Sequence, residues 1–165
     1  MSRFVSPLRR RSLLAIATST ALLAACGTKP PAPPKPTLVA GSIKASAGVN
    51  KSPSGRPSPL QMRVYELKTS AAFSGADFMA MYQGDQAALG ADVVSREEMT
   101  LQPGETRPYN KTLSPDTRFI GVVGFYRDLE RANWRTVVAI QPNKSQALAI
   151  TAGDLAVSAV NTVQP

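Results

Sequence analysis

The segment Arg-Phe-Ile-Gly-Val-Val-Gly-Phe-Tyr-Arg, residues 118–127, decides the class of fold to which this chain belongs. It is the most hydrophobic segment outside the N-terminal region. Its apolar residues would lie on both faces of a strand, which favours a strand at the centre of a sheet. Gly121 and Gly124 would let neighbouring groups approach the backbone closely or would mark a bulge.

Several other segments alternate between apolar and polar residues or are rich in β-formers, as strands with one buried face do. They are residues 38–49, 60–68, 93–102, 106–113, 134–141, 147–150 and 155–160. The segment 93–102 also fits a helix, but the strand is favoured, and the proline-containing segment 106–113 suits a sheet edge. With turn signals every 8–15 residues, this pattern is typical of a β-sandwich or barrel of about eight strands.

Residues 70–89 depart from the strand pattern, because alanines mix with aromatic and methionine residues at helical spacing. The sequence predicts a small helical insertion at about residues 70–90. Ser74-x-x-Asp77 resembles a capping box that would start the helix, and Gly84 would end it. The simplest role for the aromatic residues is a second core against one face of the sheet. A pocket for a small apolar ligand in the same place is the alternative.

Between the first two predicted strands lies a loop that contains three prolines, three serines and a glycine. Such a segment cannot form a strand or a helix, and it is too long for a tight hairpin, so it should project from the sheet. A proline-rich loop loses little conformational entropy on binding, which suits recognition. The residues proposed for contact with a partner are Asn50, Lys51, Ser52, Pro53, Ser54, Gly55, Arg56, Pro57, Ser58 and Pro59.

The first 25 residues are organised as a secretory signal peptide. Arginines at positions 3, 9, 10 and 11 precede an apolar run that is too short to span a membrane permanently. The only cysteine of the chain, Cys26, follows Leu23, Ala24 and Ala25, and this arrangement resembles the lipobox of bacterial lipoproteins. In such proteins the cysteine becomes the first mature residue and carries acyl chains. The alternative is an ordinary secreted protein with a cysteine there by chance.

Residues 26–36 comprise Cys26 and a proline-rich segment, residues 27–36, that separates it from the predicted β-sandwich domain at residues 37–161. In polyproline II geometry this segment would reach about 30 Å. It would therefore act as a tether between the lipidated cysteine and the folded domain.

Composition excludes several classes of function. Four of the 19 basic residues and none of the 11 acidic residues lie in the first 25 positions, so the net charge falls from +8 to +4 after cleavage. With no run of basic residues, binding to nucleic acid is not expected. The chain has no histidine and no nucleophile or phosphate-binding motif. We therefore expect a protein that is not an enzyme and holds neither a metal nor a cofactor.

The order of these features resembles one known family. After the lipobox and the Gly-Arg-Pro-Ser-Pro loop come Arg63-Val-Tyr-Glu-Leu67, Ala76-Asp-Phe78, Leu101-x-Pro-Gly-Glu105, Ile120-Gly-Val-Val-x-x-Tyr-Arg127 and Trp134-Arg135. Together these resemble the TssJ family (SciN- or VasD-like), the outer-membrane lipoproteins of the bacterial type VI secretion system. The similarity covers roughly residues 40–140.

The resemblance implies a transthyretin-like β-sandwich anchored in the inner leaflet of the outer membrane, on the periplasmic side. It also implies that the loop between the first two strands binds the periplasmic C-terminal region of TssM, an inner-membrane protein that acts with TssL. Gly27 agrees with outer-membrane sorting as it is known in enterobacteria. The alternative function is a periplasmic lipoprotein that carries a small apolar ligand.

Overall fold

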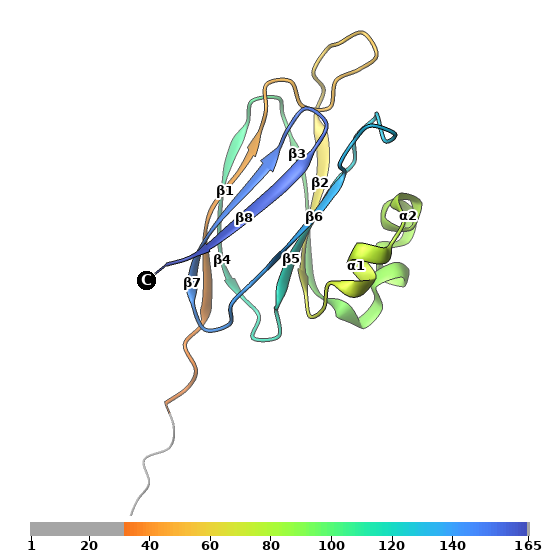
Figure 1. Ribbon diagram of the computed structural model, residues 1–165. Coiled ribbons are helices and arrows are strands. Elements are labelled where there is room, and N and C mark those ends of the chain that lie inside the picture. The colour runs from red at the N-terminus through yellow and green to blue at the C-terminus, as the bar shows by residue number, and fades with distance from the viewer. Residues whose placement is uncertain (1–31, 165) are drawn as a thin grey trace, which may run out of the picture. The chain divides into compact units, whose positions relative to one another are not determined.

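The computed structural model describes residues 32–164 and contains eight strands in two four-stranded sheets (Figure 1). In spatial order, the first sheet contains β4 (Thr106–Leu113), β1 (Thr37–Ala45), β7 (Ser145–Ala152) and β8 (Val157–Val163). The second contains β3 (Val93–Leu101), β2 (Leu60–Leu67), β5 (Phe119–Gly124) and β6 (Arg135–Ala139). The predicted mainly-β, two-sheet sandwich is therefore confirmed. The signal segment, the lipobox and Cys26 lie outside the described residues.

Strand β5 occupies the inner position that its sequence predicted, between β2 and β6. Five of its six residues are buried, because one face meets the other sheet and the other face meets the helices. The predicted close approach at Gly121 is confirmed, since a β-carbon there would lie 2.7 Å from a ring carbon of Phe73. Strand β4, with Pro108, lies at an edge as expected.

Strand β1 is shorter than predicted. It ends at Ala45, and the chain turns before residue 50. β1 pairs with β4 in antiparallel and with β7 in parallel orientation, over almost its whole length. At the C-terminal end of the chain, β8 continues to Val163, beyond the expected domain boundary at residue 161.

The helical region contains α1 (Ala71–Gly75), α2 (Phe78–Leu89) and a short 3-10 turn, η1 (Gly90–Asp92). The prediction that Ser74 starts the helix is wrong, because Ser74 lies inside α1. Asp77 caps α2 instead, and its Oδ1 accepts a hydrogen bond from the Ala80 N–H at 2.8 Å. Gly84 does not end α2 but interrupts it, with φ −159° and ψ 53°.

Two hydrophobic cores hold these layers together. The larger core lies between the two sheets and includes Ile43, Leu60 and Ile150. The smaller core lies between the second sheet and the helices, where Phe73 and Met81 meet Tyr65. Phe73 and Phe78 of the helical insertion therefore belong to the predicted second core, whereas Tyr82 is 50% exposed.

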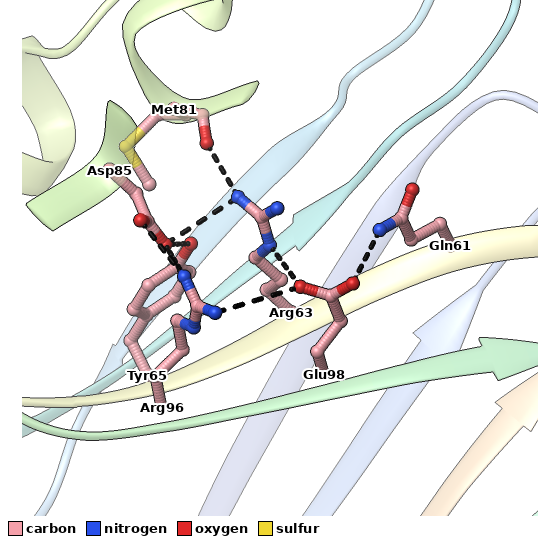
Figure 2. A network of polar contacts seen from close by, with 7 residues as sticks. All are labelled: Gln61, Arg63, Tyr65, Met81, Asp85, Arg96 and Glu98. Atoms are coloured by element: carbon pink, nitrogen blue, oxygen red, sulfur yellow. Dashed lines mark hydrogen bonds and ion pairs between the residues drawn. The ribbon is translucent and has the colours of Figure 1, made fainter. Parts of the chain in front are cut away.

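Charged side chains attach α2 to the second sheet through the network in Figure 2. Asp85 on α2 accepts a hydrogen bond from the Tyr65 hydroxyl at 2.6 Å and from Arg96 Nη1 at 2.9 Å. Arg63 Nη1 donates to the Met81 carbonyl at 2.8 Å. Arg63 Nε also forms an ion pair with Glu98 at 2.7 Å. Two groups of α2 thus hold the helix on the sheet: the Met81 carbonyl and the carboxylate of Asp85, a residue that is only 6% exposed.

The environment keeps this network in one protonation state. Burial alone would raise the pKa of the Asp85 carboxyl, but hydrogen bonds from Tyr65 and Arg96 outweigh burial and lower it below its usual value. Burial raises the pKa of Tyr65, and the hydrogen bond to Asp85 raises it further. At neutral pH the phenol therefore donates and the carboxylate accepts.

A second buried carboxylate, Glu66 on β2, joins the two sheets. It accepts hydrogen bonds from the Thr117 hydroxyl at 2.6 Å and from the Ser95 hydroxyl at 2.8 Å, and it forms an ion pair with Lys111 of β4 at 2.9 Å. Burial acts to raise the pKa of Glu66, but these donors outweigh it and lower the pKa. Glu66 therefore connects β2 and β3 of one sheet to β4 of the other.

The outer surface of the first sheet, here called the open face, carries no helix (Figure 1). Strand register places its outward residues in rows that run across all four strands. They are Leu38, Ala40, Ser42, Lys44, Thr106, Pro108, Asn110, Thr112, Ser145, Ala147, Ala149, Thr151, Ser158, Val160 and Thr162. Lys44 is the only charged residue among them.

The lowered pKa values predict an acid-sensitive fold. Asp85 and Glu66 have lower pKa values in the folded chain than the ordinary values of 3.8 and 4.5. Their stabilising effect is therefore present above about pH 5 and is lost as pH falls through the folded pKa values. We expect Asp85→Asn to lower the free energy of unfolding at pH 7 by about 3 kcal/mol, because it leaves Arg63 partly uncompensated. Below about pH 4 the variant should approach the wild type.

Urea unfolding between pH 2 and pH 7 measures both effects. Asp116→Asn is the matched control, because Asp116 is exposed and forms no ion pair with the described residues. It should change stability by less than about 0.5 kcal/mol. If the free energies of unfolding of Asp85→Asn and the wild type changed with pH in parallel, the ionised Asp85 carboxylate would not be the source of the acid sensitivity.

Candidate functional site

The predicted partner loop, residues 50–59, lies at one end of the sandwich. Residues 33–36 are exposed and irregular, and they lead into the start of β1. Strand β1 then runs the length of the first sheet, and the loop follows at its far end (Figure 1). The point where the chain enters the domain and the loop are therefore at opposite ends.

Asn50 fixes the base of the loop. It has φ 51°, a left-handed conformation that asparagine tolerates better than most residues. Its Nδ2 donates to the Pro59 carbonyl at 2.7 Å, and its Oδ1 accepts from the Arg127 N–H at 2.9 Å. Its own N–H donates to the Asp154 carbonyl at 3.2 Å. Through its side chain and its own N–H, Asn50 thus joins both ends of the loop to two other connections.

The tip of the loop is held by its own hydrogen bonds. The Ser52 N–H donates to the Arg56 carbonyl at 2.8 Å, and the Gly55 N–H donates to the Ser52 carbonyl at 2.8 Å. Gly55 has φ 79°, which glycine adopts without strain. Together with Pro53 and Pro57, this turn gives an exposed and ordered tip.

A groove of about 790 Å³ runs beside the loop. Its other walls are the β5–β6 connection, residues 125–134, and the β7–β8 turn, both at the same end of the sandwich (Figure 1). The groove is lined by Lys51, Ser52, Pro53, Gly55, Arg127, Asp128, Leu129, Glu130, Arg131, Asp154 and Leu155. It therefore offers mainly charged groups with two leucines.

At the end of the sandwich that carries the loop, some charged side chains form ion pairs and others have no ion-pair partner among the described residues. Lys51 Nζ pairs with Asp154 at 2.7 Å, and together with the Ser46 hydroxyl it lowers the pKa of that carboxyl. Arg131 pairs with Asp128. Within residues 32–164, neither Arg56 nor Arg127 forms an ion pair, although both are exposed. These two guanidinium groups are available for charge-assisted hydrogen bonds to a partner.

The predicted partner-binding residues therefore divide into two groups. Asn50 and Ser58 are 4% and 8% exposed, and they hold the loop in place instead of offering a contact surface. Ser52 is half-buried. The remaining members are exposed: Lys51, Pro53, Ser54, Gly55, Arg56, Pro57 and Pro59.

The space between the helices and the second sheet was the alternative site, for an apolar ligand. Phe73, Met81 and Leu89 are buried there. The hollow that remains there, of about 370 Å³, has Asp85 and Arg96 in its wall. Because these charged groups line it, the hollow does not favour an apolar ligand.

Residues 32–164 contain no group of three or more cysteine, histidine or acidic side chains placed to hold a metal ion. Among the helices described, none has both the length and the hydropathy needed to cross a membrane.

Neither the groove nor the role of Asn50 is evident from the sequence pattern. An asparagine just before a proline-rich loop is a signal for a left-handed turn residue, and it could have marked Asn50 as structural. The β5–β6 connection and Asp154 are 77 and 104 residues away from Asn50, and no local pattern shows that they meet the loop.

Comparison with known proteins supports the resemblance. The sequence profile of the type VI secretion lipoproteins (VasD, EvfM, TssJ) matches residues 37–155. The structure is similar to that of the T6SS lipoprotein TssJ1 from Pseudomonas aeruginosa, with 40% identity over 79% of this chain and 99% of that chain and a TM-score of 0.75. No curated protein matches the sequence.

Two more distant structures have the same fold. A chain in a type VI membrane complex is 25% identical over 78% of this chain and 98% of that chain, with a TM-score of 0.60. A chain in the structure of the T6SS protein TssM C-terminal domain from EAEC is 24% identical over 78% of this chain and 98% of that chain, with a TM-score of 0.57. The second of these shows the fold alone.

The geometry of Asn50 predicts a large effect of a small substitution. Asn50→Ala removes two hydrogen bonds and forces alanine into a left-handed conformation, so we expect a loss of about 2–4 kcal/mol in the free energy of unfolding. Asn50→Gly keeps the conformation and loses only the hydrogen bonds, so its loss should be smaller, about 1–2 kcal/mol.

Urea unfolding of both variants measures the difference. Ser54→Ala at the exposed tip is the control and should change stability by less than about 0.5 kcal/mol. Equal stabilities of Asn50→Ala and the wild type would show that the side chain does not hold the loop.

Proposed function

Because this chain belongs to the type VI secretion lipoprotein family, we propose that it is a structural lipoprotein with no catalytic role. In this proposal acyl chains on Cys26 anchor it to the inner leaflet of the outer membrane, and residues 50–59 bind the periplasmic C-terminal region of TssM. TssL belongs to the same complex. The protein would thus link the secretion complex mechanically to the outer membrane.

The observation that carries this proposal is the separation of the two ends along β1. The nine residues of β1 span about 30 Å at about 3.3 Å per residue. The chain enters at one end, and the ordered loop leaves at the other (Figure 1). A domain tethered near Thr37 can therefore present the loop away from the membrane.

The loop has the physical properties of a binding site. Its tip is exposed but ordered by internal hydrogen bonds and prolines, so little conformational entropy is lost on binding. Arg56 and Arg127 lie exposed at this end without an ion-pair partner among the described residues. The choice of TssM as the partner follows from the resemblance to the TssJ family.

The anchor follows from chemistry at Cys26. Each buried methylene adds about 0.8 kcal/mol to membrane affinity, so several acyl chains hold a protein stably where one would not. The lipobox Leu23, Ala24 and Ala25 would direct this modification, and residues 26–36 would set the reach of the tether. Gly27 fits sorting to the outer membrane.

Removing the anchor should separate attachment from folding. We expect Cys26→Ser to move the protein from the outer-membrane fraction to the soluble periplasmic fraction and to abolish secretion by the system. The thermal unfolding midpoint of the released protein should equal that of the anchored one. Fractionation and circular dichroism measure these outcomes, and retention of Cys26→Ser in the outer membrane would refute the anchor.

Changing the loop tip should weaken the partner contact alone. We expect Arg56→Glu to lower the affinity for the purified periplasmic domain of TssM by about tenfold or more, because a charge-assisted contact becomes repulsive. Deletion of residues 52–57 should weaken binding further without lowering the thermal midpoint. Calorimetric titration at two salt concentrations measures both, and the effect of Arg56→Glu should shrink at high salt.

Lys68→Glu is the matched control for this titration. Lys68 is exposed, follows β2 directly at the end opposite the loop, and changes the net charge by the same amount. It should bind TssM as the wild type does. If both substitutions weaken binding equally, or if the deletion leaves affinity unchanged, residues 50–59 are not the contact.

A further inference from the structure

The open face differs from the outer side of the second sheet. The outer side of the second sheet is covered by α1 and α2, and its charges serve to hold α2 (Figure 2). The open face has no cover and almost no charge, although exposed sheet surfaces of soluble proteins usually carry both signs of charge. Val160 is 63% exposed and Leu38 is 40% exposed on it. Apart from Lys44, the other outward residues of this face carry apolar side chains or uncharged hydroxyl and amide groups, so a protein surface can approach it without displacing charge.

The residues at its centre are small and flat. Register places Ala40 beside Ala147 and Ser42 beside Ala149, with Val160 next to Ala149 on β8. None of these side chains projects far from the sheet, so a second flat sheet can approach closely. Lys44 is the last outward residue of β1, at the end near the loop, and its long side chain can reach solvent from the rim.

Charge and geometry together select the occupant. A nearly neutral face gives a charged partner nothing to recognise, whereas it meets its own copy without repulsion. The face also runs parallel to the line from Thr37 to the loop (Figure 1). A two-fold axis along this line therefore keeps both chain entries at one end and both loops at the other. Two copies anchored to one membrane can meet in this way without withdrawing either loop.

The area of the face is sufficient for a weak dimer. Four strands about 4.8 Å apart and about eight residues long at about 3.3 Å per residue give roughly 500 Å² per copy. Two copies would bury roughly 1,000 Å², at the lower end of specific interfaces. Confinement to a membrane raises the effective concentration, so that a weak interface is occupied.

We propose that two copies of this chain pack through their open faces, sheet against sheet, as a membrane-anchored dimer. The orientation argument rests on the proposed anchor and loop, but the contact itself does not require TssM. The proposal predicts that Ala149, near the centre of the face, lies opposite its own counterpart.

Cross-linking of the full, lipidated chain in outer membranes tests this. With Ala149→Cys, a short bifunctional maleimide should give a product of twice the mass of the chain. Thr100→Cys is the matched control, because Thr100 is exposed on β3 of the other sheet and should give no dimer. The unsubstituted chain, with Cys26 alone, should also give none.

A second substitution separates specific contact from random collision. Adding Ser42→Arg to Ala149→Cys places a long charged side chain inside the contact, next to Ala149 and facing Val160 of the other copy, and it should abolish the dimer without changing the thermal midpoint. The proposal is overturned if Ala149→Cys gives no more dimer than Thr100→Cys, if Ser42→Arg has no effect, or if the product contains a different protein. Loss of TssM binding by the loop deletion, with the dimer retained, would show that the two sites are independent.

Discussion

The pairing of β1 on both sides is the constraint on which the rest of the arrangement depends. β1 forms an antiparallel ladder with β4 and a parallel ladder with β7, over nearly its whole length. Because it is an inner strand, its two ends cannot move relative to the sheet without breaking both ladders. The start of the strand and the loop that follows it are therefore fixed at opposite ends. In the proposed role, load between tether and loop acts along β1, where the hydrogen bonds of both ladders share it.

The second sheet satisfies a different constraint. Strand β5 is buried on both faces, so the sheet needs a cover, and α1 and α2 provide it. An apolar contact alone would leave the position of a short helix loosely defined. Asp85, Tyr65 and Arg63 define it instead through directed bonds, and each polar atom that they bury has a partner (Figure 2). Burial of charge is costly, so this arrangement favours a unique position of α2 more than it favours stability.

The sequence predicted the local features well because each has a local cause. Alternation identified the strands, Pro108 indicated an edge, and the composition of residues 50–59 excluded regular structure. It misplaced the helix start, because Ser74 and Asp77 both fit a cap and only packing selects Asp77. The rest depends on contacts between distant segments: the parallel pairing of β1 with β7, the burial of Glu66, and the meeting of Asn50 with Arg127. No pattern within a short window contains that information.

The two faces and the two ends of the sandwich differ in how charged side chains are distributed over them. Charges gather around Asp85, where they are paired, and around the loop, where Lys51 is paired but Arg56 and Arg127 are not, and they are nearly missing from the open face. A domain that only had to stay dissolved would spread its charges more evenly. One end with unpaired arginines and a neutral open face are instead expected of a protein that contacts two different partners. The ordered loop suits a partner at the end of the domain away from the tether, and the flat open face suits a second copy along its side. Strand β1 separates the anchor from the loop, and it therefore orients both contacts.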